Sequence, residues 1–441
     1  MDMFQELQDR IQARTALIGV IGLGYVGLPM GVRAARAGFP VLGFDVEEER
    51  VASLNAARSY IGDVSSAELH ELIAAERFAA TTDYGRIAAC DIIIICVPTP
   101  LNDYREPDLS YIEAAATGVA NTLRPGQLVI LESTTWPGTT EEVLQPRFAA
   151  HGLSVGVDYF LAFSPERIDP GHTGSQGYTV ENTPKVVGGI TGHCTQIAAL
   201  FYRQIVNEVV EISSPRAAEM TKLFENIFRN VNIALVNELA MLCDRMGLNV
   251  WEIIDAAATK PFAFMKHTPG PGLGGHCIPL DPFYLNWKAR EYDFQTRFIE
   301  LAGEINMAMP YHVQTLIVRA LNRHRKSLNG SLVVLLGVAY KRDIADYRES
   351  PVFKIMDLIE AGGAEVVTVD PHIETFASHR GRIYSTTPLS DDLLHHADCV
   401  VFITDHSAFP VERIVREAAL VVDTRNATKH VREGREKIVL L

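Results

Sequence analysis

One cysteine of this 441-residue sequence lies in a segment that cannot form the interior of a helix or strand. The run from Pro269 to Tyr284 reads Pro-Gly-Pro-Gly-Leu-Gly-Gly-His-Cys-Ile-Pro-Leu-Asp-Pro-Phe-Tyr and includes Cys277. Because glycine and proline at this density break regular elements, we expect a shaped loop that leaves one side of the thiol uncluttered. A structural cysteine needs no such loop, so we predict that Cys277 is a catalytic nucleophile.

Two polar neighbours of Cys277 have more than one interpretation. Asp281 lies four residues further on, where it could act as a base beside the thiol or cap the helix that follows. His276 directly precedes the cysteine, and a structural role fits the sequence as well as a catalytic one.

The remaining five cysteines do not form a recognisable site. Cys90, Cys96 and Cys399 lie in or beside apolar runs, which predicts small buried side chains. No Cys-x-x-Cys pair occurs, so the sequence predicts neither a zinc site nor a disulfide framework, and we expect no metal.

A second polar cluster lies in a helical pattern. Lys222 and Asn226 are four residues apart and therefore share one face of a helix. An ammonium and an amide are suitable hydrogen-bond donors to a developing oxyanion. The alternative is that both are ordinary solvated residues.

A glycine-rich loop near the N-terminus predicts a dinucleotide site. Gly22, Gly24 and Gly27 fit G-x-G-x-x-G, follow an apolar strand and open a helix, while Tyr25 and Val26 lie within the loop. The helix N-terminus offers free N–H groups to a pyrophosphate.

An acid at the end of the next strand favours NAD over NADP as the cofactor. Asp45 comes 21 residues after Gly24, where its carboxylate would accept hydrogen bonds from a ribose diol and repel a 2′-phosphate. Arg50, about one helical turn beyond, could cover the adenine side. FAD is a weaker alternative, because no further flavin signature follows.

Three other strand ends carry polar groups where open α/β sheets bind ligands. They are the Val97-Pro98-Thr99-Pro turn, the Glu132-Ser-Thr134-Thr135-Trp-Pro turn and the Phe163-Ser-Pro-Glu166-Arg167 turn. Hydroxyls and a carboxylate there suit contacts to a nicotinamide ribose, positioning of a water and acid–base work.

The elements that must position these groups alternate between apolar strands and helices, as in a doubly wound, mostly parallel sheet. The N-terminal strands are predicted at 17–21, 41–45, 78–82, 92–97, 128–132, 159–163, 185–188 and 209–212. Apolar positions from Leu223 to Leu242 then recur every three or four residues, which predicts one long helix over 215–247. A second helix is predicted over 296–322.

The α/β pattern returns after Ser331, with strands predicted at 332–337, 365–369, 399–403 and 420–423. We therefore predict an α/β fold with an N-terminal Rossmann domain (1–212), a central helical region with a long helix (213–325) and a C-terminal Rossmann-like domain (326–441).

Composition limits the partners and the location. The sequence is 47% hydrophobic and 21% charged, with a net charge of −14, which argues against a nucleic-acid partner. No apolar run reaches the roughly 18 residues of a membrane span, and the N-terminus lacks a secretion signal. We expect a cytoplasmic protein with no membrane partner.

These motifs, in this order, resemble the UDP-glucose/GDP-mannose dehydrogenase family. The resemblance runs from about Leu17 to the C-terminus and rests on G-L-G-Y-V-G-L-P, V-P-T-P, S-T-T-W-P-G-T, S-P-E-R, the helix with Lys222 and Asn226, G-G-H-C-I-P-L-D and Gly337-Val-Ala-Tyr-Lys-Arg-Asp-Ile-Ala-Asp-Tyr-Arg-Glu-Ser350. It implies an NAD domain, a central dimerisation region, a UDP-sugar domain and thus a homodimer or higher oligomer.

The resemblance also implies residue roles. Two hydride transfers from C6 of a UDP-sugar would pass through a thiohemiacetal and a thioester on Cys277. Lys222 and Asn226 would steady the C6 oxygen, Asp281 and Glu166 would serve as acid–base groups, and Thr135 would help to place water. Further contacts to cofactor or substrate are expected from Tyr25, Val26, Pro98, Thr99, Thr134, Arg167, Gly274, Lys341, Arg348 and Arg425.

Two departures from the UDP-glucose branch indicate an N-acetylated sugar. His276 precedes the cysteine, and Leu280 replaces a lysine common before the aspartate. We expect UDP-N-acetylglucosamine first, UDP-N-acetylmannosamine second and UDP-glucose third, with the uronic acid supplied to a bacterial surface polysaccharide or O-antigen. The rival functions are a two-electron hydroxy-acid or 6-phosphogluconate-type dehydrogenase and an inactive NAD-binding regulator.

Overall fold

The computed structural model describes the whole chain except residues 1, 103–105, 168–177, 276–277, 279 and 379–380. The chain forms two compact units, each made of two stretches of sequence. Unit 1 comprises Met1–Glu225 and Phe283–Phe294, and unit 2 comprises Asn226–Pro282 and Gln295–Leu441. Helices α8 (Pro215–Met246) and α10 (Asp281–Ala289) therefore begin in one unit and end in the other.

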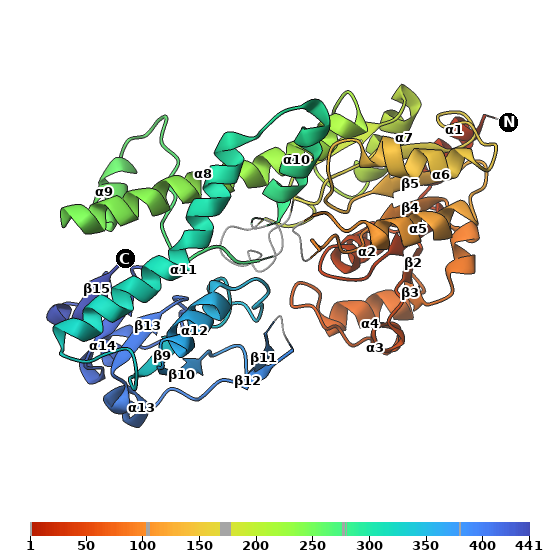
Figure 1. The fold of residues 1–441 in the computed structure, drawn as a ribbon. Helices are drawn as coiled ribbons and strands as arrows, with labels where there is room; N and C mark the ends of the chain where they lie inside the picture. The colour runs from red at the N-terminus through yellow and green to blue at the C-terminus, as the bar shows by residue number, and fades with distance from the viewer. Residues whose placement is uncertain (1, 103–105, 168–177, 276–277, 279, 379–380) are drawn as a thin grey trace. The chain divides into compact units, whose positions relative to one another are not determined.

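Unit 1 is built on an eight-stranded sheet of order β3-β2-β1-β4-β5-β6-β7-β8, of which β2 to β5 are labelled in Figure 1. Neighbouring strands run parallel, except that β6 and β7 are antiparallel. Each N-terminal strand predicted from the apolar runs is present, which confirms the Rossmann domain. The strands are β1 (Ile18–Ile21), β2 (Val41–Phe44), β3 (Phe78–Thr81), β4 (Ile92–Ile95), β5 (Leu128–Leu131), β6 (Phe160–Phe163), β7 (Lys185–Gly189) and β8 (Val209–Glu211).

The helices of unit 1 cover this sheet with apolar faces. Leu7, Leu28, Leu69 and Ile197, one each from α1, α2, α4 and α7, belong to one buried core with the strands. The helices are α1 (Met3–Gln12), α2 (Gly27–Arg36), α3 (Glu48–Asn55), α4 (Ser66–Ala74), α5 (Ser110–Ala120), α6 (Gln145–Ala149) and α7 (Gly192–Tyr202), with short turns η1 (Tyr84–Ala89), η2 (Thr140–Leu144) and η3 (Arg290–Tyr292).

Unit 2 contains a five-stranded parallel sheet of order β10-β9-β13-β14-β15. Alternate residues of β9 enter two separate cores: Val333 packs with α11 and α12, and Val334 packs with α13 and α14. This period of two places one helical layer on each face of the sheet, which confirms the C-terminal Rossmann-like domain. The strands are β9 (Leu332–Leu336), β10 (Glu365–Val369), β13 (Cys399–Phe402), β14 (Val421–Asp423) and β15 (Ile438–Leu440).

The remaining elements of unit 2 are a hairpin and the helices. An antiparallel hairpin of β11 (Thr375–Ala377) and β12 (Ile383–Ser385) stands apart from the main sheet. The helices are α9 (Val250–Ala257), α11 (Arg297–Arg323), α12 (Pro351–Ala361), α13 (Asp391–His396) and α14 (Val411–Glu417), and the last turn is η4 (Arg435–Lys437). Among the described residues, no helix is long and apolar enough to cross a membrane.

The long helix α8 begins and ends where the sequence predicts. The Ser214 hydroxyl accepts a hydrogen bond from the Ala217 backbone N–H at 3.2 Å, and Pro215 occupies the first helical position. Gly247 follows the last turn with φ +70°, a conformation that favours glycine. In unit 2, α9 packs on α8 through Trp251, whose indole N–H donates to the carbonyl oxygen of Leu441 at 2.8 Å.

Candidate functional site: strand ends, two glycine turns and the face of a long helix

The glycine-rich loop after β1 has the shape that a bound pyrophosphate requires. Gly22 adopts φ +89°, and a Cβ there would lie 2.6 Å from the carbonyl oxygen of Cys96. A Cβ on Gly27 would lie 1.9 Å from the carbonyl oxygen of Gly22. Gly24 faces open space, so only the middle glycine leaves room for a ligand to approach the backbone. The loop therefore fits a dinucleotide above the start of α2.

Asp45 is held firmly at the end of β2. The side chain is buried, its Oδ2 accepts a hydrogen bond from the Leu23 N–H at 3.0 Å, and its Oδ1 accepts one from the Glu47 N–H at 3.1 Å. Arg50 lies 3.6 Å from the same carboxylate. Tyr60, which the sequence analysis missed, donates its hydroxyl to the Leu23 carbonyl oxygen at 2.6 Å, and burial together with Asp45 raises the pKa of Tyr60 to about 12.

The turn after β4 also lies at this edge of the sheet. Pro98 is exposed and Thr99 is buried, and the Thr99 carbonyl oxygen accepts a hydrogen bond from the Tyr284 hydroxyl at 2.7 Å. This bond fixes the turn to the part of α10 that belongs to unit 1.

The turn after β5 fixes the direction in which the Thr135 hydroxyl donates its proton. Thr134 is half-buried, whereas Thr135 is buried with its Oγ1 2.6 Å from the Oγ1 of Thr139. The Thr139 hydroxyl donates to the Trp136 carbonyl oxygen at 3.0 Å. Because each hydroxyl has one proton, Thr135 must donate to Thr139. Thr135 can then offer only lone pairs to a ligand or a water.

A buried glutamate on α8 anchors this turn. Glu219 accepts the backbone N–H groups of Gly138 at 2.5 Å and Thr140 at 2.9 Å, and it also accepts the Thr140 hydroxyl at 2.7 Å. Burial raises the pKa of Glu219 to about 7, although these hydrogen bonds oppose the rise. Sequence reasoning missed Glu219, because a polar residue on a long helix is usually solvated.

Lys222 lies one turn further along α8 and is only 7% exposed. Among the described residues, its ammonium group has no hydrogen-bond or ion-pair partner. An ammonium group has three N–H donors, and none of them is taken up by the described protein groups. The arrangement suits a group that meets an anionic or oxygen-rich ligand.

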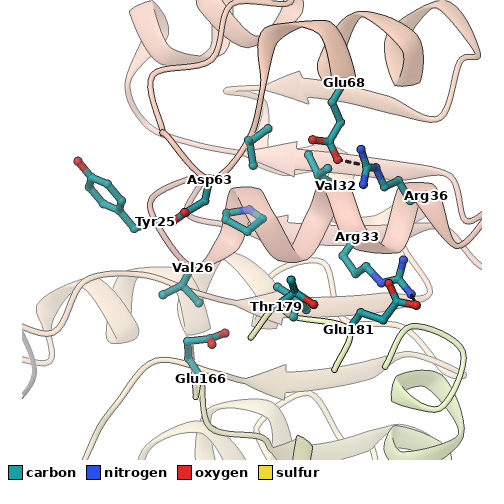
Figure 2. A pocket seen from close by; sticks show the side chains of 13 residues that line it. Tyr25, Val26, Val32, Arg33, Arg36, Asp63, Glu68, Glu166, Thr179 and Glu181 are labelled. Carbon is teal, nitrogen blue, oxygen red and sulfur yellow. Dashed lines mark ion pairs between the residues drawn. The ribbon is translucent and has the colours of Figure 1, made fainter. Parts of the chain in front are cut away.

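Glu166 and Arg167 follow β6 and differ in their surroundings. Arg167 is committed to protein contacts, with Nη2 2.6 Å from Glu225 and Nη1 donating to the Pro184 carbonyl oxygen at 2.8 Å. Glu166 instead lines a pocket with Tyr25 and Val26 of the glycine-rich loop (Figure 2). The other residues of that pocket come from α2, α4 and nearby loops: Pro29, Val32, Arg33, Arg36, Asp63, Val64, Glu68, Thr179, Val180 and Glu181.

In unit 2, Asn226 and Asp281 are paired. Both side chains are buried, and the Asn226 amide donates to Oδ2 of Asp281 at 2.5 Å. Asp281 is the first residue of α10, so the pairing fixes the end of the segment that carries the predicted nucleophile. Cys277 and His276 themselves lie outside the described residues.

Two further asparagines bind the same segment, and a third binds those two. Asn230 donates to the Ile278 carbonyl oxygen at 3.1 Å, and Asn237 accepts the Gly270 N–H at 3.0 Å. Asn306 on α11 accepts a hydrogen bond from Asn237 at 2.8 Å and donates to the Asn230 carbonyl oxygen at 3.2 Å. The glycine-rich segment is therefore fixed on both sides of position 277 by buried amides, which sequence reasoning also missed.

The glycines of this segment are packed against the loop after β9. A Cβ on Gly274 would lie 2.4 Å from Cβ of Tyr340, and one on Gly275 would lie 2.9 Å from the Tyr340 ring. Gly275 adopts φ +82° and donates its N–H to the Arg348 carbonyl oxygen at 2.9 Å. The Arg348 guanidinium is paired with Asp346 at 2.7 Å.

The loop after β9 repeats the glycine turn of unit 1. Gly337 has φ +98° and donates to the Val369 carbonyl oxygen at 2.8 Å, as Gly22 does to Phe44. Asp370 at the end of β10 accepts the Val338 N–H at 2.7 Å, in the same manner as Asp45. Near this second turn lie Lys341, which is half-buried, and Arg425, whose Nε donates to the Ile403 carbonyl oxygen at 2.8 Å.

Asp343, His372 and His406 cluster at the same edge, with ligand-type atoms within 4.8 Å of one another. His406 is already engaged: its Nδ1 accepts the Asp343 N–H at 3.0 Å, and its Nε2 lies 3.2 Å from Asp370. The five described cysteines are free and buried.

The fold and these sites define a nicotinamide-dependent dehydrogenase with a second, nucleotide-binding α/β domain. The chain belongs to the UDP-glucose/GDP-mannose dehydrogenase family. Residues 16–206 match the NAD binding domain of that family, residues 216–308 its central domain and residues 334–430 its UDP binding domain. The cofactor is therefore NAD, and the rival 6-phosphogluconate-type class is set aside.

Two of the relatives are dehydrogenases of N-acetylated UDP-sugars. UDP-N-acetyl-D-mannosamine dehydrogenase of Pyrococcus horikoshii is 36% identical over 419 residues, which cover 93% of this chain and 96% of the relative. UDP-N-acetyl-D-glucosamine 6-dehydrogenase of Pseudomonas aeruginosa is 33% identical over 396 residues, covering 89% and 91%. The solved structure of the Pyrococcus horikoshii mannosamine enzyme aligns with a TM-score of 0.86 at 33% identity and covers 96% of this chain and 98% of that one.

The raised pKa of Glu219 predicts how stability depends on pH. The folded state holds the Glu219 proton more tightly than the unfolded state, so the free energy of unfolding decreases as pH rises from about 4.3 to about 7, by an amount on the order of 3 kcal/mol. Glu219→Gln removes this proton. The free energy of unfolding, measured with denaturant at pH 5, 6, 7 and 8, should fall for the wild type relative to the variant across this interval.

The matched control is Glu71→Gln, an exposed glutamate on α4. Its stability should follow the wild-type pH dependence. If the Glu219→Gln and wild-type curves stay parallel from pH 5 to pH 8, Glu219 does not hold a proton in the folded state.

Proposed function

We propose that this chain oxidises the C6 alcohol of a UDP-N-acetylhexosamine to the carboxylate in two NAD-dependent steps. UDP-N-acetylglucosamine is the first proposed substrate, UDP-N-acetylmannosamine the second and UDP-glucose the third. The observation that carries the proposal is the Lys222 side chain, which is 7% exposed and has no partner among the described residues, one helical turn before the buried Asn226–Asp281 pair. Relatives that act on N-acetylated sugars support the substrate class.

The residues of α8 would act on the reacting oxygen. Bound NAD⁺ would supply the hydride acceptor for the C6 carbon in each oxidation. Lys222 would stabilise negative charge on the C6 oxygen through its ammonium group. Asn226 donates one amide hydrogen to Asp281, which leaves its second amide hydrogen for the same oxygen.

Cys277 would provide the covalent route between the two oxidations. Its thiolate adds to the C6 aldehyde to give a thiohemiacetal, the second hydride leaves from that carbon, and a thioester remains. Water then cleaves the thioester and restores the thiol. Asp281 and Glu166 would exchange the protons, and Thr135, whose hydroxyl proton is donated to Thr139, would accept a hydrogen bond from the attacking water.

The remaining predicted residues would hold the two nucleotides. We assign Gly22, Gly24, Gly27, Asp45 and Arg50, with the turns at Thr99 and Thr134, to NAD. Gly274, Lys341 and Arg425 would contact the UDP-sugar, with Arg348 near the phosphates. Arg167 is proposed to shape the sugar site through its ion pair with Glu225. The functional division is residues 1–212, 213–325 and 326–441.

The number of NADH molecules formed per sugar tests the proposed reaction. Purified protein with NAD and a panel of the three UDP-sugars should release two NADH per sugar oxidised and no free aldehyde. Cys277→Ser should reduce turnover by about 10³-fold or more, since a serine hydroxyl is far less ionised than a thiol at neutral pH. Its binding of NAD should be unchanged.

Cys243→Ser is the control, because Cys243 is buried where α8 packs on α9. It should keep most of the activity. One NADH per sugar with a released aldehyde would instead identify a two-electron dehydrogenase, and a tenth of wild-type turnover in Cys277→Ser would exclude the covalent route.

We further propose that the protein is a homodimer that pairs through α8. Phe224, Phe228, Leu235, Leu242 and Met246 are exposed on this helix at spacings of four and seven, which place them along one face. Exposed apolar side chains in such a row are typical of an interface.

Light scattering at micromolar concentration should give the mass of a dimer, about twice 48.7 kDa. Leu235→Glu should yield the monomer, since the charge would be buried without a partner. Ile383→Glu, at an equally exposed apolar position on β12, should leave the dimer intact. A monomeric wild-type protein would disprove the interface.

A further inference from the structure

A buried lysine lies directly behind Glu166 in unit 1. Lys185 is the first residue of β7, and its side chain is 5% exposed. Its ammonium lies 3.0 Å from Oε1 of Glu132 and 3.8 Å from Oε2 of Glu166. None of the motifs that predict the site includes Lys185.

Lys185, Glu132 and Glu166 form a cluster, and neighbouring elements fix the part of it around Glu132. Glu132 follows β5 and is completely buried, and its carboxylate accepts the hydroxyl of Tyr202 from the end of α7. The thiol of Cys96 lies 3.9 Å from the other oxygen. The Lys185 ammonium also lies 5.2 Å from the centre of the Tyr202 ring. These contacts leave the ammonium little freedom to move.

Glu166 is the only one of these five residues that also lines the pocket beside the glycine-rich loop (Figure 2). Its side chain is 12% exposed, so it can meet a ligand or a water on one side and Lys185 on the other. Lys185 cannot reach the pocket itself, and any effect it has on the reaction must pass through Glu166.

The charges of the cluster explain what the lysine does. Burial favours the neutral amine, but the carboxylates of Glu132 and Glu166 outweigh it and raise the pKa of Lys185 above its usual value. The lysine is therefore a stable cation between two carboxylates. Burial raises the pKa of the Cys96 thiol and of the Tyr202 hydroxyl, so these two groups keep their protons.

We infer that Lys185 is a positioning residue that holds the Glu166 carboxylate directed into the pocket. The inference rests on the acid–base role proposed above for Glu166. An ionised, oriented carboxylate can take a proton from water as that water attacks the thioester, whereas a protonated one cannot. Glu132 serves as the fixed counter-ion that keeps the lysine in place.

Replacement of Lys185 by Met should alter the pH profile of turnover. Because a nearby cation favours the ionised form of a carboxylate, its removal should move the acidic limb of the kcat profile up by about one pH unit. At pH 7 kcat should fall by about 10- to 100-fold with KM little changed. Lys185→Arg keeps the charge and should restore the wild-type pH profile.

Lys185→Met leaves Glu132 buried without its cation, which lowers stability for a reason unrelated to catalysis. The double variant Lys185→Met/Glu132→Gln removes that unpaired charge and should show the same displaced limb. If its pH profile superimposes on that of the wild type, Lys185 has only a structural role and the inference is wrong.

Glu166→Gln separates this inference from the proposed function. In the Glu166→Gln background, Lys185→Met should cause no further loss of kcat, and two multiplicative losses would contradict action through Glu166. If wild-type protein oxidises no UDP-sugar, the proposed function fails. Wild type, Glu166→Gln, Lys185→Met and the double variant Glu166→Gln/Lys185→Met then test the contact between Lys185 and Glu166 by thermal unfolding. Non-additive changes in melting temperature support the pairing, and additive changes overturn it.

Discussion

A row of polar side chains buried along one helix is the constraint on which the rest of the site depends. Buried polar groups destabilise a protein unless each finds a partner. Glu219, Asn226, Asn230 and Asn237 on α8 meet this demand by binding loops: the turn after β5, Asp281, Ile278 and Gly270. Spacings of seven, four and seven place them on one face of the helix. Lys222 shares that face and has no such partner in the described chain.

This arrangement explains how irregular loops can carry precise chemistry. The segment before α10 is rich in glycine and proline, which do not favour a regular ladder of backbone hydrogen bonds. Asn230 and Asn237 of α8 bind its backbone, and Asn306 of α11 binds these two asparagines. The turn after β5 is fixed in the same way by Glu219. Catalytic geometry set by a rigid helix is better defined than geometry set by the loops alone.

Much of the fold follows from local patterns in the sequence. The apolar runs predict every strand of the first sheet, and the periodicity from Leu223 to Leu242 predicts α8, because burial on a sheet and on a helix leaves different repeats. The short strands β11, β12 and β15 have three residues each and no such signal. Antiparallel β7 within a parallel sheet could not be predicted either, since pairing direction depends on the path of the chain.

The site was predictable only where a motif concentrates unusual residues. The glycine turn at Gly22 and the segment around Cys277 stand out by composition. Glu219, Asn230 and Lys185 do not, because their partners are 19 to 81 positions away and each resembles an ordinary surface residue. Their function depends on burial, which only the three-dimensional structure reveals.

The most direct test of the account is the mass of the peptide that contains Cys277. Glu166→Gln protein, in which hydrolysis should be slow, is mixed with NAD and UDP-N-acetylglucosamine, quenched with acid and digested. We predict a thioester of the UDP-uronic acid on Cys277 that is absent without NAD and absent when Cys277 is Ser. Two NADH per sugar from wild-type protein, with no adduct in any quenched sample of either protein, would contradict the covalent mechanism.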